Sequence, residues 1–184
     1  MAARLIALLG MLITAIGAPV ARAEPPDPLY ALVDSATQRL LTADSVAASK
    51  WITGGPITDV PRARQVLDAV GADATAHGVD PGYVRAIFGD QIDATEGVEY
   101  TLFGQWKFGT AAAPTTAPDL SQSRAAIDGY TKAMVDEVAR QWDLLHGPGC
   151  AGELDDARSA VVAARRLDEL YQQALQSATR SYCP

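Results

Sequence analysis

Cysteine and histidine are scarce in this sequence, which has two of each among its 184 residues. A structural zinc site usually needs four such ligands, grouped at short spacings. His77 and His146 are far apart in the chain and show no such spacing. We therefore expect no metal.

Positive charge is scarce as well. The 15 Lys and Arg residues stand against 22 Asp and Glu residues, and the formal net charge is −7. Binding of nucleic acid is driven by clustered positive charge. The composition thus argues against a nucleic-acid partner.

Strand patterns are almost absent, because no sustained alternation of β-branched and polar residues occurs. Ala, Leu, Gln, Arg and acidic residues dominate, as they do in helices. We expect an all-α, single-domain bundle of five to six helices. The expected helical ranges are 28–51, 59–78, 80–106, 119–145 and 153–182, the last with a break within 164–167.

The first residues have the pattern of an export signal. Arg4 precedes an apolar run over residues 5–20, and Ala21-Arg22-Ala23 forms a small-residue cleavage pattern before a polar, proline-rich stretch. A membrane anchor is the alternative, but the run is shorter than the roughly 20 residues that span a bilayer. We expect residues 1–23 to be a signal peptide cleaved after Ala23 and residues 24–184 to form one exported domain, secreted or periplasmic, with no later membrane segment.

Cys150 and Cys183 both lie in this exported part, where an oxidising compartment favours a disulfide. One straight helix between them would hold their Cα atoms about 50 Å apart. A disulfide needs roughly 4.4–6.8 Å. Either the chain doubles back near residues 164–167, which we favour, or the bond joins two chains.

Several cations recur at helical spacing. Arg39 and Lys50 are eleven residues apart, so one continuous helix would place both on the same face, about 16 Å apart along its axis. Thr95 and Glu99 share a face at i, i+4. Arg62 follows the expected helix cap Asp59, where backbone N–H groups favour anions. Together with Arg124, these residues predict a pocket for a small dianion in an otherwise acidic protein.

The segments around these residues resemble the exported, all-helical subclass of bacterial chorismate mutases, which implies a fold like that of the type II enzymes. The similarity covers essentially the whole mature chain. The matching residues are Leu32-Val33-Asp34, Arg39-Leu40, Ala43-Asp44, Lys50-Trp51, Pro56-Ile57, Asp59, Arg62, Val79-Asp80-Pro81, Tyr83-Val84, Asp90-Gln91-Ile92, Ala94-Thr95-Glu96, Glu99-Tyr100, Trp106-Lys107, Asp119-Leu120-Ser121, Ser123-Arg124, Ile127-Asp128 and Ser181-Tyr182-Cys183.

The resemblance implies rearrangement of chorismate to prephenate, a pericyclic step with no covalent intermediate and no cofactor. The substrate has two carboxylates, and its breaking ether bond builds negative charge on oxygen. Cations that fold the substrate and donors preset around that oxygen would therefore accelerate the reaction. By the same resemblance the enzyme would be a homodimer with each pocket built within one chain.

Site roles follow from the resemblance. Arg39, Arg62 and Arg124 would bind the carboxylates through bidentate guanidinium contacts. Lys50 would donate to the ether oxygen, with Glu99 on the other side of that oxygen. An ionised Glu99 would repel the developing charge, so we expect it to act protonated, its pKa raised by burial.

Three further positions complete the expected site. Thr95 would hydrogen-bond a carboxylate, and Asp59 would contact the region of the ring hydroxyl. The family pattern has a Gln one helical turn after the Arg62 position, whereas this chain has Val66 there, preceded by Gln65. A one-residue step turns a side chain by about 100°, so we do not expect Gln65 to take the role of the missing Gln.

Two other classes of function fit the same residues. A non-catalytic exported helical module could use the cationic cavity to bind a small anion or a partner protein. A secreted structural dimer is the second alternative. An assay of chorismate loss separates the enzyme from both.

Overall fold

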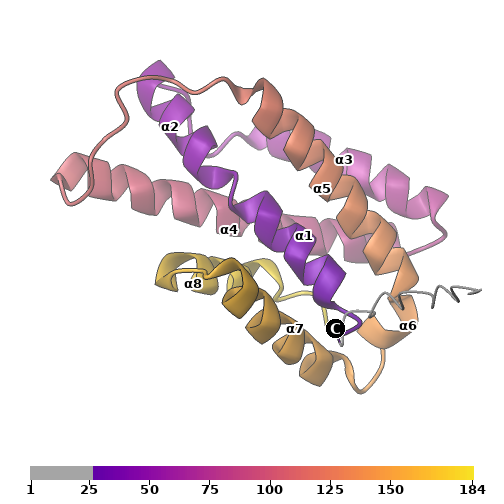
Figure 1. Ribbon diagram of the computed structural model, residues 1–184. Coiled ribbons are helices and arrows are strands. Elements are labelled where there is room, and N and C mark those ends of the chain that lie inside the picture. The colour runs from indigo at the N-terminus through magenta and orange to yellow at the C-terminus, as the bar shows by residue number, and fades with distance from the viewer. Residues whose placement is uncertain (1–26) are drawn as a thin grey trace, which may run out of the picture.

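The computed structural model describes residues 27–184, so the predicted signal peptide lies outside the described residues. Figure 1 shows an all-helical molecule, as predicted. The helices are α1 (Tyr30–Leu40), α2 (Ala43–Thr53), α3 (Val60–Ala76), α4 (Pro81–Phe108), α5 (Leu120–Arg140), the one-turn α6 (Trp142–Leu145), α7 (Cys150–Arg165) and α8 (Glu169–Ala178). These eight segments within residues 27–184 exceed the expected five to six because one expected helix is divided and α6 is a separate turn.

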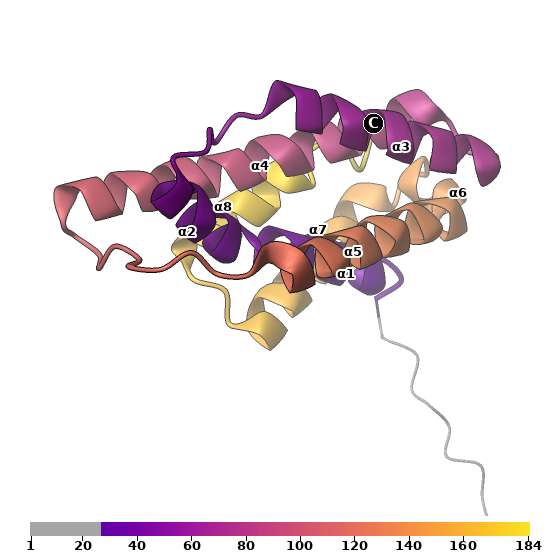
Figure 2. The same cartoon turned by 90° about the horizontal axis from the view of Figure 1, so that it is seen from above.

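The helices surround one apolar core. α3 and α4 run side by side along one side of the molecule, and α1 and α5 pack together along the other (Figure 2). α7 and α8 cover the remaining side of α1 and α4. Facing stripes of three helices contribute many of the side chains without solvent exposure: Leu32, Val33, Ala36 and Leu40 of α1; Val84, Ile87 and Phe88 of α4; and Met134, Val135 and Val138 of α5.

The first expected helix is not continuous, and this prediction was wrong. α1 ends at Leu40 and α2 begins at Ala43. The Thr42 hydroxyl and the Thr42 backbone N–H both donate to the carbonyl of Arg39, at 2.7 and 3.2 Å. These bonds close a tight turn in place of the regular helical ladder. Because the interruption is short, Arg39 and Lys50 still face one cavity from consecutive helices.

Aspartates cap α3, α4 and α5, three of the helices that border this cavity, and the cap at Asp59 was predicted from the sequence. Asp59 accepts from the backbone N–H of Arg62 at 3.1 Å. Asp80 accepts from the N–H of Tyr83 at 2.6 Å, and Asp119 from that of Ser121 at 2.8 Å. Each carboxylate satisfies a donor that the helix leaves free at its first turn.

The disulfide joins Cys150 to Cys183 within the chain, with their Cα atoms 5.7 Å apart. The chain doubles back where predicted: α7 ends at Arg165, and Arg166 has a left-handed backbone with φ of 52°. Intramolecular pairing is therefore the correct alternative.

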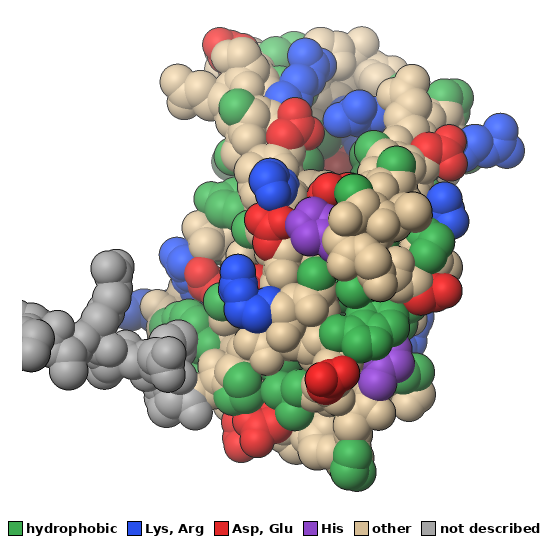
Figure 3. Space-filling model, turned by 90° about the vertical axis from the view of Figure 1, so that its right-hand side faces the viewer, with side chains coloured by type: hydrophobic (Ala, Val, Ile, Leu, Met, Phe, Trp, Pro, Cys, Tyr) green, Lys and Arg blue, Asp and Glu red, His purple; other side chains and the backbone are tan. Residues whose placement is uncertain are grey.

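Basic and acidic side chains are interspersed over the face drawn in Figure 3. On that face of the described residues they do not form the continuous basic surface that nucleic acid would need. Within residues 27–184, no helix combines the length and the hydrophobicity needed to cross a bilayer.

Candidate active site

A cavity of about 330 Å³ lies among α2, α3, α4 and α5 and reaches the end of α1. All eight residues predicted for the site line it. They come from separate parts of the chain: Arg39, Lys50, Asp59, Arg62, Val66, Thr95, Glu99 and Arg124. Sequence positions spread over 86 residues thus share one wall.

Arg39 is a buried cation at the C-terminal end of α1, 7% exposed. Its Nη1 donates to Oε1 of Gln91 at 3.4 Å, and its guanidinium carbon lies 5.7 Å from the ring centroid of Phe88. Burial lowers the pKa of Arg39 to about 10, which still leaves it charged at neutral pH. Among residues 27–184 no carboxylate forms an ion pair with it. A buried, unpaired charge is costly, and an anionic ligand would offset that cost.

Lys50 and Glu99 form the central polar contact of the cavity. Lys50 Nζ lies 2.7 Å from Glu99 Oε2 and donates to the carbonyl of Ile57 at 2.9 Å. An ammonium group has three N–H donors, so one remains for a ligand. Glu99 is only 2% exposed, and burial raises its pKa, while the bond from Lys50 acts in the opposite direction.

Two more cations lie near the N-terminal ends of helices. Arg62 is in the first turn of α3, behind the Asp59 cap, and Arg124 is in the second turn of α5. Both side chains are exposed, unlike that of Arg39. The hydroxyls of Ser45 and Ser123, 3.0 Å apart, tie α2 to α5 next to Arg124. We call the buried Arg39 the floor of the cavity and the exposed Arg62 and Arg124 its rim.

The remaining predicted positions are less polar. Thr95 donates its hydroxyl proton to the carbonyl of Gln91 at 2.7 Å. Val66 lies half-buried in the cavity wall, whereas Gln65 is exposed and is not among the residues that line the cavity. The chain therefore offers an apolar contact at the position of the missing Gln.

Sequence reasoning missed seven residues of the wall: Val46, Ile57, Ala63, Ile92, Glu96, Leu120 and Ile127. Glu96 could have been found, because it precedes Glu99 by three residues and so shares its helix face. Its Oε2 accepts from the Thr58 hydroxyl at 2.7 Å. Ile57 contributes a backbone carbonyl to Lys50, a role that side-chain identity does not encode.

A second hollow, of about 500 Å³, lies between α7 and α8. Among the described residues that line it, the one cation is Arg158, which pairs with Asp155. Glu169 adds another negative charge. Although larger, this hollow lacks the free cations that a dicarboxylate requires.

Comparison with known proteins identifies the family. The model of chorismate mutase type II matches residues 30–100. The chain is 55% identical to the secreted chorismate mutase of Mycolicibacterium smegmatis, over 91% of this chain and 93% of that protein. It is 47% identical to the secreted chorismate mutase of Mycobacterium tuberculosis, over 97% and 89% respectively.

Solved structures agree. The crystal structure of chorismate mutase from Burkholderia thailandensis superposes with a TM-score of 0.79 at 37% identity, covering 85% of this chain and 99% of that one. The identity and coverage of these relatives go well beyond a shared fold. The chain therefore belongs to the family of secreted chorismate mutases.

Proposed function

We propose that this chorismate mutase works by electrostatic clamping of the chorismate dianion in the cavity of Arg39, Lys50, Arg62 and Arg124. The single observation that carries the proposal is the buried Arg39, which has no acidic partner among residues 27–184. Such a charge is tolerated where a ligand supplies the counter-charge.

The proposed roles divide between floor and rim. Arg39 holds one carboxylate in the interior, where screening by water is weak. Arg62 and Arg124 hold the other carboxylate at the rim. The clamp folds the substrate so that its reacting carbons meet, which lowers the entropic part of the barrier. Asp59 accepts from the ring hydroxyl.

Lys50 and Glu99 act on the breaking ether bond. The remaining N–H of Lys50 donates to the ether oxygen as negative charge grows there. Protonated Glu99 donates to the same oxygen through its other carboxyl oxygen, since Oε2 accepts from Lys50. Thr95 must first turn its hydroxyl away from the carbonyl of Gln91 before it can donate to a carboxylate. Its contribution to binding is reduced by the loss of that bond.

The charge balance of the cavity supports a protonated Glu99. Four cations and three carboxylates, those of Asp59, Glu96 and Glu99, line the wall. With all of them ionised the net charge is one positive unit, whereas protonation of Glu99 raises it to two. Two positive charges match a dicarboxylate.

The setting of the reaction stays a prediction. The domain of residues 24–184 works after export and cleavage behind Ala23, as a homodimer with a complete pocket in each chain. Catalysis needs no cofactor, because the rearrangement only redistributes electrons within one substrate.

The test is the rate of chorismate loss, followed by absorbance, for the wild type and for Arg39→Ala and Lys50→Ala. We expect kcat/KM to fall by about 10²-fold or more in each, the size typical of a lost transition-state donor. Arg158→Ala is the matched control, since it removes a cation from the other hollow. Small effects at Arg39 and Lys50, with the fold intact by circular dichroism, would overturn the clamp, whereas no chorismate loss by the wild type would favour the non-catalytic binding module.

A further inference from the structure

The C-terminal tail places a tyrosine behind the active site. Tyr182 has no solvent exposure. Burial raises the pKa of its hydroxyl, and the positive charge of Arg39 partly offsets that rise. Arg39 donates to Gln91, and the backbone N–H of Ser181 donates to Asp90. Tyr182 and Arg39 therefore lie beside the same turn of α4, although they are 143 positions apart in the sequence.

Three buried polar atoms in this region lack hydrogen-bond partners among residues 27–184. They are Arg39 Nε, Gln91 Nε2 and the Tyr182 hydroxyl. The first two groups belong to side chains that are bonded to each other through Arg39 Nη1 and Gln91 Oε1. Arg39 Nε and Gln91 Nε2 are donors, and a phenolic oxygen can accept. Buried polar groups are rarely left unpaired, so this grouping requires an explanation.

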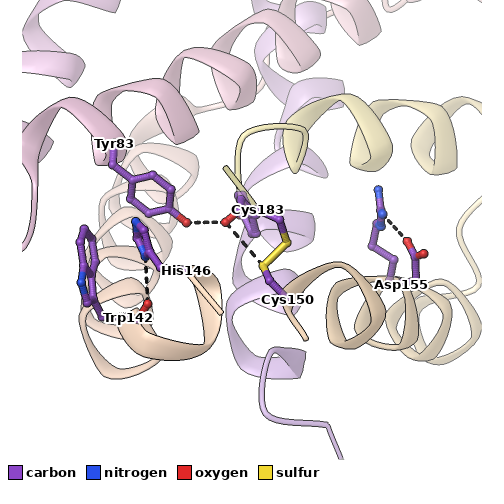
Figure 4. Close-up of a disulfide and its surroundings, with 8 residues drawn as sticks. Tyr83, Trp142, His146, Cys150, Asp155 and Cys183 are labelled. Atoms are coloured by element: carbon purple, nitrogen blue, oxygen red, sulfur yellow. Dashed lines mark hydrogen bonds and ion pairs between the residues drawn. A yellow bond between two sulfur atoms is a disulfide. The ribbon is translucent and has the colours of Figure 1, made fainter. Parts of the chain in front are cut away.

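Several contacts fix the tail at this residue. The Tyr83 hydroxyl donates to the carbonyl of Tyr182 at 2.5 Å, beside the Cys150–Cys183 disulfide (Figure 4). The buried Asp90 accepts from the backbone N–H of Ser181 at 2.9 Å and pairs with Arg180. Attachments thus flank Tyr182 on both sides.

We propose that Tyr182 is a positioning residue for Arg39, an inference that rests on the proposed role of Arg39 in substrate binding. When a carboxylate engages the guanidinium from the cavity, the Tyr182 hydroxyl accepts from Arg39 Nε at the rear. The guanidinium is then held between substrate and tail. The disulfide and Asp90 set the position of Tyr182, so the tail is part of the machinery that orients the cation.

The experiment removes only the hydroxyl, with Tyr182→Phe. We expect kcat/KM to fall about tenfold, mainly through a higher KM, because a hydrogen bond to a charged group is lost. The matched control is Tyr171→Phe, which deletes another buried hydroxyl, bonded to Asp44 at 2.8 Å and away from the cavity. This control should melt at a lower temperature and keep the wild-type KM.

A double-mutant cycle separates positioning from a general structural effect. In an Arg39→Ala background, Tyr182→Phe should cause no further loss of kcat/KM, because its target is gone. An undiminished tenfold loss in that background, or a wild-type KM for Tyr182→Phe alone, overturns the inference. Wild-type kcat/KM in Arg39→Ala would instead overturn the proposed clamp itself. The two failures are therefore distinguishable.

Discussion

Glu99 makes the activity of this enzyme depend on pH in a defined direction. Burial raises the pKa of its carboxyl above the ordinary value, even with Lys50 2.7 Å away. Below that pKa Glu99 is protonated and can donate to the ether oxygen. As the pH rises through the pKa, ionisation replaces this donor with a repelling charge. We expect kcat/KM to fall on the alkaline side, whereas Glu99→Gln, which is neutral throughout, should lack this fall.

Glu96 supplies the matched control. Its negative charge also raises the pKa of Glu99. Glu96→Gln should therefore shift the fall of kcat/KM to lower pH without abolishing it. The measurement is kcat/KM from about pH 4 to 9 for the wild type and both variants. A flat wild-type profile would rule out protonated Glu99 as the acting form.

At the scale of the helix, the residue that caps α3 is expected to affect both the free energy of unfolding and catalysis. Asp59 caps α3 and also lines the cavity, whereas Asp168 caps α8 away from it, accepting from the N–H of Tyr171 at 2.9 Å. Replacing either by Ala should cost about 1 kcal/mol of unfolding free energy. Only Asp59→Ala should also lower kcat/KM, by about tenfold, since it loses a hydrogen bond to the ring hydroxyl and loosens the turn that carries Arg62.

Thermal denaturation and steady-state kinetics of the two variants check this. Asp59 is exposed, so removing its negative charge should help anion binding only slightly. Equal kinetics for Asp59→Ala and Asp168→Ala would mean that Asp59 is a cap alone.

Local signals explain which elements could be predicted. The caps at Asp59, Asp80 and Asp119 follow from one carboxylate and its neighbouring N–H groups, so the sequence contains them completely. The turn at Leu41 and Thr42 contains no Gly or Pro and interrupts a pattern that reads as helical. It depends on the Thr42 hydroxyl bonding to Arg39. Thr side chains inside continuous helices also donate to a backbone carbonyl of the preceding turn, as Thr95 does to Gln91.

The residues of the site likewise include some that the sequence marks and some that it does not. Charged residues such as Arg39, Lys50 and Glu99 could be picked out because their spacing and family resemblance mark them. Their supporting partners could not, since Ile57 acts through its backbone and Gln91 through a contact 52 residues away. Helical periodicity predicts which residues share a face, but it does not predict how two helices are placed against each other.

At the scale of the whole molecule, one disulfide closes a 33-residue loop around α7 and α8. By loop-closure entropy, its loss should lower the unfolding free energy by about 3–4 kcal/mol. Thermal or urea denaturation of the oxidised and reduced protein measures this difference. A Cys150→Ser/Cys183→Ser variant, insensitive to reductant, is the control for unrelated effects of the reducing agent.

The same bond should affect catalysis less than it affects stability. Without it, Tyr83 and Asp90 still hold the backbone on either side of Tyr182. In the folded, reduced enzyme KM should therefore rise by less than it does in Tyr182→Phe, because the hydroxyl is retained but is held less firmly. A reduced enzyme that stays folded and has a larger KM than Tyr182→Phe would show that the disulfide positions more of the active site than this one tyrosine.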